Sequence, residues 1–257
     1  FRTNFATIDG GFVVQDRRAG RIQSGQRELE EALSELKSKA HPDVDVLFKA
    51  STEHRGALIL RGPDLSANST EADPHREGEK IRMVKSRAES VQGTRTADVL
   101  NEVIHASYEI LSELPLNKTR EAEGKLPANV LLPRGASAMP KLESLKQKYG
   151  IESSVIAGGA LYNGLAQLVG MKRRAVDGAT GGLDTDLMAK FEAALEELSR
   201  ADFVFVHMKG TDTASHDKDA EAKITFIEKI DEAMGFLHDK SYWRETHLAF
   251  TGDHCTP

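Results

Sequence analysis

Apolar residues recur along this sequence with two different periods, and segments of the two kinds alternate. Apolar positions three or four residues apart predict helices over 27–40, 96–114, 139–149, 161–169, 185–199 and 219–237. Short apolar runs predict strands over 11–15, 45–49, 57–60, 129–132, 154–157, 203–208 and 247–250. Strands that alternate with helices indicate a parallel sheet with crossover helices. The pattern therefore predicts an α/β fold, with 45–49 and 57–60 as paired strands and 203–208 as a buried one.

Two segments interrupt this alternation. Residues 62–93 are polar and rich in Pro, Gly, Ser and charge, and they predict a long loop. Loops of that length in compact proteins are usually functional. Residues 171–182 are basic and then rich in glycine, and they predict a domain boundary. We therefore expect one domain over 1–173 and a second over 174–257.

Composition narrows the class of protein. The chain has 257 residues, of which 39% are apolar, and a formal net charge of -6, which argues against a dedicated nucleic-acid binder. The apolar runs are too short to span a bilayer, and no export signal is visible. Cys255 has no second cysteine with which to form an internal disulfide. These features fit a cytoplasmic enzyme, as they fit many other proteins, and they indicate no membrane or nucleic-acid partner. They leave the oligomeric state open.

Two Asp/His pairs follow predicted strands. Asp212 and His216 lie four residues apart after 203–208, so a helical turn would place both side chains on one face. Asp253 and His254 are adjacent and follow 247–250. Taken singly, such residues are more often helix caps or surface histidines. Taken together, they favour a site for two ions such as Zn²⁺ or Mn²⁺, the arrangement that clamps both oxygens in phosphoryl transfer.

Basic residues cluster in a second kind of motif. Arg17, Arg18 and Arg21 lie within five residues in the run Asp16-Arg-Arg-Ala-Gly-Arg-Ile. Guanidinium groups bind phosphates and carboxylates in bidentate fashion, so this run suits a phosphorylated acid. A solvated basic turn explains it equally well. Arg134 follows the strand 129–132, where an anion contact competes with the more frequent surface arginine.

Two histidines are candidates for proton transfer near neutral pH. His54 lies between the two paired strands, and His75 lies in the long loop in the run Asp73-Pro-His. The alternative for His54 is that it only ends a strand. Motifs for ATP or NAD binding and the nucleophile elbow of α/β-hydrolases are absent from the sequence.

Several of these motifs together resemble one enzyme family. They are Phe1-Arg-Thr-Asn-Phe-Ala-Thr, Asp16-Arg-Arg-Ala-Gly-Arg-Ile, His54-Arg-Gly, Asn129 to Gly135, Gly178-Ala-Thr-Gly, Lys209-Gly-Thr-Asp-Thr-Ala-Ser-His-Asp and Thr251-Gly-Asp-His. The set resembles the archaeal-type 2,3-bisphosphoglycerate-independent phosphoglycerate mutases of the alkaline phosphatase superfamily. The resemblance implies an alkaline-phosphatase-like core, with a mostly parallel sheet between helices, and an inserted smaller α/β (α+β) domain. Residues 1–173 would then be the substrate-clamping insert and 174–257 part of the metal-binding core.

The resemblance also implies an activity and roles for residues. Such enzymes are isomerases that interconvert 3-phosphoglycerate and 2-phosphoglycerate in glycolysis and gluconeogenesis, through a phosphoserine and with two divalent ions. The ions are usually Mn²⁺, with Mg²⁺, Co²⁺ or Zn²⁺ in some members, and no 2,3-bisphosphoglycerate is needed. Asp212, His216, Asp253 and His254 would bind metal, and His54 would shuttle a proton. Arg18, Arg21, Arg55 and Arg134 would clamp the substrate.

The sequence departs from the family in one respect. The segment with a D-G metal-binding strand and the catalytic serine has no counterpart here, and neither has a further histidine ligand after Pro257. We therefore expect the natural protein to be longer and this chain to be inactive by itself. A metal-dependent phosphatase or phosphonate hydrolase of the same superfamily remains the alternative enzyme, and a non-catalytic relative that binds metal or metabolites is the alternative of another class. A serine or threonine nucleophile in the preceding sequence would favour an enzyme.

Overall fold

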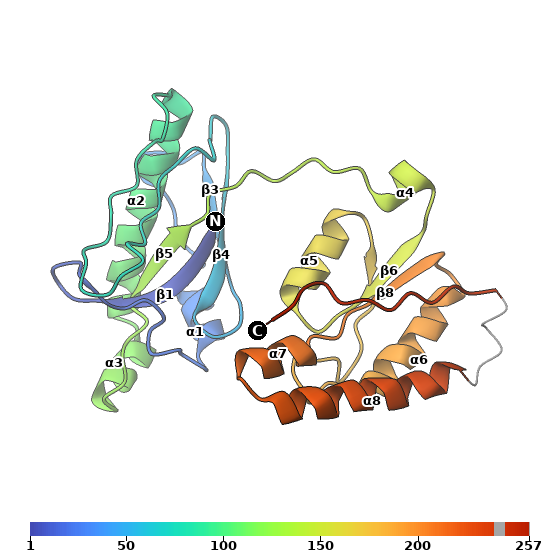
Figure 1. The fold of residues 1–257 in the computed structure, drawn as a ribbon. Coiled ribbons are helices and arrows are strands. Elements are labelled where there is room, and N and C mark those ends of the chain that lie inside the picture. The colour runs from blue at the N-terminus through green and yellow to red at the C-terminus, as the bar shows by residue number, and fades with distance from the viewer. Residues whose placement is uncertain (239–244, 257) are drawn as a thin grey trace. The chain divides into compact units, whose positions relative to one another are not determined.

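The computed structural model describes residues 1–238 and 245–256, so the parts of the predicted second domain at 239–244 and at 257 lie outside it (Figure 1). The chain forms two compact units, Phe1–Met139 and Pro140–Pro257. The first contains an antiparallel sheet and the second a parallel one. The predicted α/β class is therefore confirmed, but the predicted parallel sheet is found only in the second unit.

Five antiparallel strands form the sheet of the first unit, and β1 is at its centre. The strands are β1 (Arg2–Ile8), β2 (Val14–Asp16), β3 (Asp45–Ala50), β4 (Arg55–Arg61) and β5 (Val130–Arg134). β1 pairs with β2, β4 and β5, and β3 pairs with β4 at the edge. The predicted pairing of 45–49 with 57–60 is confirmed, since Leu47 faces Ile59. Opposed residues of an antiparallel pair share one face of the sheet, so the register decides which side chains meet.

Three helices accompany this sheet: α1 (Gln26–Ala32), α2 (Val91–Ser112) and α3 (Pro115–Ala122). The hydroxyl of Ser90 caps α2 by accepting from the Gly93 N–H at 3.0 Å. α2 packs on β5, and the Leu131 N–H donates to Ser107 Oγ at 3.1 Å (Figure 1). The buried residues of α2 recur at helical spacing, as the sequence predicts. Between β4 and α2, residues 62–90 contain no helix or strand, so the predicted long loop is confirmed.

The second unit contains a three-stranded parallel sheet in the order β7-β6-β8. Its strands are β6 (Ser153–Ile156), β7 (Lys172–Arg173) and β8 (Phe203–Val206). Its helices are α4 (Leu145–Tyr149), α5 (Ala160–Leu168), α6 (Leu187–Leu198), α7 (Gly210–His216) and α8 (Ala220–His238). α5 follows β6 and precedes β7, and α6 lies between β7 and β8, so the chain makes the crossovers that a parallel sheet requires.

The boundary between the units lies before β6, not after β7 as the 171–182 segment predicted. Ser154 of β6 pairs with Lys172 of β7 and with Val204 of β8. Residues 153–173 therefore belong to the same sheet as 203–206. The basic, glycine-rich segment 171–182 does not mark the domain boundary, because it is a connection within the second unit.

Several predicted elements differ from the structure. The predicted helix 27–40 ends at Ala32. The predicted strand 247–250 is irregular, and Leu248 and Phe250 are 49% and 65% exposed, because these residues pair with no described strand. β8 is not buried, since Phe203 and Phe205 are 45% and 40% exposed at the edge of the sheet. No helix within residues 1–238 or 245–256 has the length and apolar character that crossing a membrane requires.

Gly158 joins β6 to α5 where another backbone segment passes very close. A Cβ at this position would lie 2.1 Å from Thr180 C and 2.6 Å from Gly181 N. We expect Gly158→Ala to lower the free energy of unfolding by about 1–3 kcal/mol, because the backbone of 180–181 has to move. Gly164→Ala, inside α5 with nothing within 4 Å of the added Cβ, should instead raise it by about 0.5–1 kcal/mol. Urea denaturation measures both, and equal effects would contradict the close approach.

Candidate functional site

The turn after β2 presents the arginines of the first basic motif. Asp16 Oδ1 accepts from the backbone N–H groups of Arg18 at 2.6 Å and Gly20 at 3.1 Å, which closes the turn. Ala19, Gly20 and Arg21 all have positive φ. The side chains of Arg18 and Arg21 are exposed, and neither forms an ion pair within the described part of the chain. Both arginines are therefore available to an anion.

His54 lies at the start of β4 and is 5% exposed. Its Nδ1 is buried and has no hydrogen-bond partner among the described residues. Burial lowers the pKa of His54, and the charges of Arg55, Arg18 and Arg134 lower it further, while Glu53 opposes them. The structure thus brings three of the four predicted substrate-binding arginines into the electrostatic surroundings of the predicted catalytic histidine. Arg21 is not among them.

Arg134 ends β5 and is half-buried beside two other arginines. Its register partner on β1 is Arg2, so the two side chains share one face of the sheet. Arg134 Nη2 donates to Asn4 Oδ1 at 3.2 Å, and Nη1 lies 3.7 Å from Asp73 Oδ2. Burial lowers the pKa of Arg134, the Asp73 charge raises it, and the charges of Arg2 and Arg17 lower it. Repulsion between like charges this close is relieved when an anion binds.

Arg55 faces Asn4 on the next strand and therefore lies on the same face of the sheet as Arg2 and Arg134. Its Nη1 donates to Glu53 Oε2 at 2.6 Å. Since Arg55 is exposed, this surface ion pair contributes little stability and does not prevent exchange for a ligand. Such a face, with three guanidinium groups, can bind the carboxylate and the phosphate of a small acid.

Arg2, Arg17, Arg55 and Arg134 form an arginine cluster in the first unit. The sequence analysis included Arg2 and Arg17 in motifs but assigned neither of them a role in the site. The period of two along β1 would have placed Arg2 and Asn4 on one face, had that strand been predicted. The partner of Arg17, Asp73, is 56 residues away and carries no local signal.

The environment of His54 makes a testable prediction about pH. A pKa below the ordinary 6.5 means that the folded protein prefers neutral His54, so its contribution to stability is complete above about pH 6.5 and is lost as the pH falls further. We expect NMR of the histidine rings to show one imidazole with a midpoint below 6.5, whose signal disappears in His54→Asn. The spectrum of His105→Asn, an exposed histidine of the same unit, identifies a different signal. A His54 midpoint at or above 6.5 would contradict the assignment.

The second unit carries the Asp/His pairs near α7. Asp212 and His216 lie on one face of that helix, as their spacing predicted, with His216 Nε2 3.4 Å from Asp212 Oδ1. His254 Nε2 lies 3.9 Å from the same oxygen and 3.5 Å from Asp253 Oδ2. The four predicted metal ligands therefore lie in one neighbourhood, although Asp253 reaches it only through His254.

The Asp212 carboxylate is engaged by other side chains in this arrangement. Lys209 Nζ donates to Oδ2 at 2.7 Å and Thr256 Oγ1 donates to Oδ1 at 2.9 Å. The hydrogen bond from Lys209 lowers the pKa of Asp212 against the opposing effect of burial. Within 1–238 and 245–256, no group of three or more His, Cys, Asp or Glu side chains has a geometry that could hold a metal ion. The donor chemistry suits a transition-metal ion, and each oxygen of Asp212 accepts one of these two hydrogen bonds.

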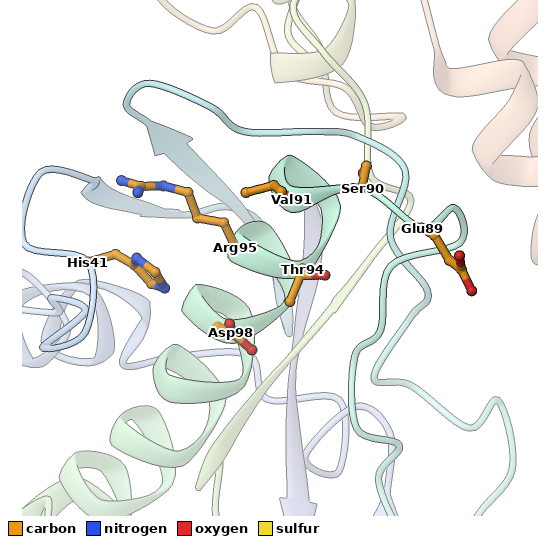
Figure 2. A pocket seen from close by; sticks show the side chains of 7 residues that line it. All are labelled: His41, Glu89, Ser90, Val91, Thr94, Arg95 and Asp98. Carbon is orange, nitrogen blue, oxygen red and sulfur yellow. The ribbon is translucent and has the colours of Figure 1, made fainter.

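A hollow on the surface of the first unit shares no residue with either set (Figure 2). It has a volume of about 570 Å³ and lies at the start of α2, between His41 and Asp98. It is lined by residues of both charges, and the Arg95 guanidinium is held by Asp43 at 2.6 Å. Nothing in this hollow gathers groups for acid–base or metal chemistry.

Comparison with known proteins shows which enzymes this chain resembles. The family model described as 2,3-bisphosphoglycerate-independent phosphoglycerate mutase matches residues 1–117. The enzyme of that name, numbered 1, from Methanocaldococcus jannaschii is 43% identical over 257 residues, and that from Ignicoccus hospitalis is 44% identical over 260. Both alignments cover all of this chain and 62% of the relative. The solved cofactor-independent phosphoglycerate mutase from Thermoplasma acidophilum superposes with a TM-score of 0.69 at 34% identity, over 93% of this chain and 60% of that one.

The chain is thus similar, along its whole length, to part of the cofactor-independent phosphoglycerate mutases. Its resemblance to the archaeal-type 2,3-bisphosphoglycerate-independent enzymes, predicted from the motifs, is confirmed by relatives that match it from end to end. The chain spans 62% of the length of these curated relatives.

Proposed function

We propose that the protein encoded by the complete gene of this chain interconverts 3-phosphoglycerate and 2-phosphoglycerate without 2,3-bisphosphoglycerate, as an isomerase of glycolysis and gluconeogenesis in the cytoplasm. The similarity of the entire chain to archaeal enzymes of this name carries the proposal. We further propose that the first unit binds the substrate and that the second belongs to an alkaline-phosphatase-like core that binds the metal ions.

The arginines of the first unit bind the anionic groups of the substrate in this proposal. Phosphoglycerate carries a carboxylate and a phosphate, and each accepts two parallel hydrogen bonds from one guanidinium group. Arg55 and Arg134 lie on one face of the sheet, and Arg18 approaches from the turn after β2. Arg21, exposed on the same turn, supplies a further positive charge. Held at both ends, phosphoglycerate presents its phosphoester in a fixed orientation, which lowers the entropic cost of the reaction.

His54 transfers protons in this proposal. The resemblance implies that the phosphoryl group leaves the 3-oxygen for a serine oxygen and then bonds to the 2-oxygen. One glycerate oxygen must therefore gain a proton, and the other must lose one. A histidine kept neutral at pH 7 by burial and by three arginines can accept a proton, and Nδ1 has no competing partner. Its depressed pKa also makes the protonated form a ready donor.

The second unit supplies four of the ligands for two divalent ions, with Mn²⁺ as the first choice and Mg²⁺, Co²⁺ or Zn²⁺ as alternatives. Asp212, His216, Asp253 and His254 would hold these ions, and bound ions would stabilise negative charge on the transferred phosphoryl group. Lys209, once released from Asp212, remains as a cation beside the site. Its ammonium group can then bind a phosphate oxygen.

The test uses the protein expressed from the complete gene, dialysed against a chelator and then supplied with Mn²⁺. We expect conversion of 3-phosphoglycerate to 2-phosphoglycerate that requires Mn²⁺ and no added 2,3-bisphosphoglycerate. Release of inorganic phosphate without conversion would overturn the proposal in favour of a hydrolase. Binding of 3-phosphoglycerate with neither reaction would favour a non-catalytic relative.

A further inference from the structure

The long loop 62–90 places one carboxylate at the centre of the arginine cluster. Asp73 is completely buried. Arg17 holds it through two parallel hydrogen bonds, from Nε to Oδ1 at 2.9 Å and from Nη2 to Oδ2 at 2.6 Å. Arg134 Nη1 lies 3.7 Å from Oδ2. One negative charge therefore contacts two guanidinium groups, and the cluster keeps a net positive charge for a ligand.

A second path joins the same two arginines. Asn4 Nδ2 donates to the backbone oxygen of Arg17 at 3.0 Å, and Asn4 Oδ1 accepts from Arg134 Nη2 at 3.2 Å. Arg17 and Arg134 are thus fixed relative to each other through a carboxylate and through an amide. Guanidinium groups repel each other in the absence of such partners, so the links determine where Arg134 points.

His75 and Glu71 extend the network along the loop. Arg17 Nη2 lies 3.0 Å from His75 Nδ1, and because arginine can only donate, Nδ1 must accept. The proton of the neutral ring is then on Nε2, which donates to Glu71 Oε2 at 2.8 Å. The other oxygen of Glu71 accepts from the N–H of Gly135, next to Arg134, at 3.1 Å. The loop therefore contacts both segments that carry the arginines.

Asp73 is unsuited to contact with the substrate itself. Its side chain is closed to solvent, both oxygens are engaged, and a carboxylate repels a phosphate. Burial raises the pKa of Asp73. The hydrogen bonds from the Arg17 side chain and from the backbone N–H of His75 bring this pKa below its ordinary value, so the group stays ionised. Its place in the network is therefore that of a fixed counter-charge.

We propose that Asp73 is a positioning residue that, together with Arg17 and His75, holds the Arg134 guanidinium in the orientation in which it binds the anionic substrate. This inference rests on the proposed function, since it concerns the geometry of the same arginine cluster. Asp73 and His75 act through the arginines and transfer no proton to or from the glycerate.

The first test compares Asp73→Asn with the wild type in the protein expressed from the complete gene. The amide keeps the shape but loses the charge, and we expect kcat/KM for 3-phosphoglycerate to fall about tenfold to a hundredfold. If Asp73 acts through Arg134, the same substitution in an Arg134→Met background should change kcat/KM by less than about twofold. Equal factors in the two backgrounds would overturn the proposal. Asp64→Asn, at an exposed carboxylate of the same loop, should leave kcat/KM unchanged.

A second measurement does not depend on activity. Crystal structures of the wild type and of Asp73→Asn should differ in the position of the Arg134 guanidinium group, and an unmoved guanidinium would overturn the inference whatever the assay shows. Absence of conversion by the wild type would instead count against the proposed function alone. If Asp73→Asn does not fold, His75→Ala replaces it, because that side chain is exposed. We then expect a decrease of about threefold to tenfold and the same displacement.

Discussion

Under the proposed function, replacing Asp212 by alanine in the protein expressed from the complete gene is expected to reduce conversion of 3-phosphoglycerate by about a thousandfold or more. Metal ions that neutralise a transferred phosphoryl group contribute several kcal/mol to the stabilisation of the transition state, and each ~1.4 kcal/mol corresponds to a factor of ten. Asp212 Oδ1 is the oxygen that both His216 and His254 approach. Removal of this carboxylate would leave the imidazoles of His216 and His254 without the oxygen that both of them approach.

Steady-state kinetics and metal content should change together in this variant. We expect Asp212→Ala to retain fewer bound Mn²⁺ ions per chain after dialysis, as measured by atomic emission, with an unchanged circular dichroism spectrum. Asp217→Ala is the matched control, because Asp217 is an exposed carboxylate immediately after the same helix. Full activity in Asp212→Ala, or an equal loss in Asp217→Ala, would refute the role of Asp212 as a metal ligand.

The sequence predicted the structure well where the interacting residues are close to each other along the chain. Asp212 and His216 approach each other because a helix brings residues four apart onto one face. The pairing of β3 with β4 follows from two short apolar runs with a polar turn between them. In both cases the interacting residues are close in sequence, so local periodicity contains the information.

β1 shows why other strands could not be predicted. This central strand is almost entirely buried, yet it contains Thr3, Asn4 and Thr7, so it has no apolar alternation. Two of these polar side chains form hydrogen bonds with residues far away in the sequence. Thr7 Oγ1 donates to the backbone oxygen of Pro127 at 2.6 Å, and Asn4 contacts the two arginine segments. Burial of polar groups is tolerated where such bonds form, and only the folded chain reveals them.

The helix predicted over 139–149 illustrates a local signal that was overlooked. Pro140 disfavours helical backbone at Met139, which is 80% exposed. The helix begins only after Ser144, whose side chain forms a capping box with Gln147. The apolar spacing was therefore correct only for the last turns, and Gly150 ends the helix with φ 73° as predicted.

The candidate site likewise has one part that could be predicted from the sequence and one part that could not. The arginines themselves could be predicted because their residue type suits an anion. Their arrangement could not, because it depends on Asp73 in the long loop, 56 residues from Arg17. Polar loop residues acquire such roles through tertiary contacts that leave no periodic trace.

Replacing Arg134 by methionine is expected to lower kcat/KM for 3-phosphoglycerate by about a hundredfold. Loss of one charge-assisted bidentate contact costs about 2–4 kcal/mol in a site from which water is largely excluded, and Arg134 is the most enclosed of the proposed clamp arginines. Methionine retains much of the packing of the aliphatic stem. Asp73 keeps both hydrogen bonds from Arg17, so the substitution leaves no buried charge without a partner.

The division of this effect between KM and kcat tells what Arg134 does. A higher KM with unchanged kcat would mean that Arg134 binds substrate and transition state equally, whereas a lower kcat would mean that it also aligns the glycerate during transfer. We expect both to change, because a substrate held at one end only is poorly aligned. Arg61→Met, at the other end of β4 and exposed, is the matched control and should leave both constants unchanged. If Arg134→Met retains the kcat/KM of the wild type, the arginine cluster is not the substrate site, and the positive face of this sheet serves another anion.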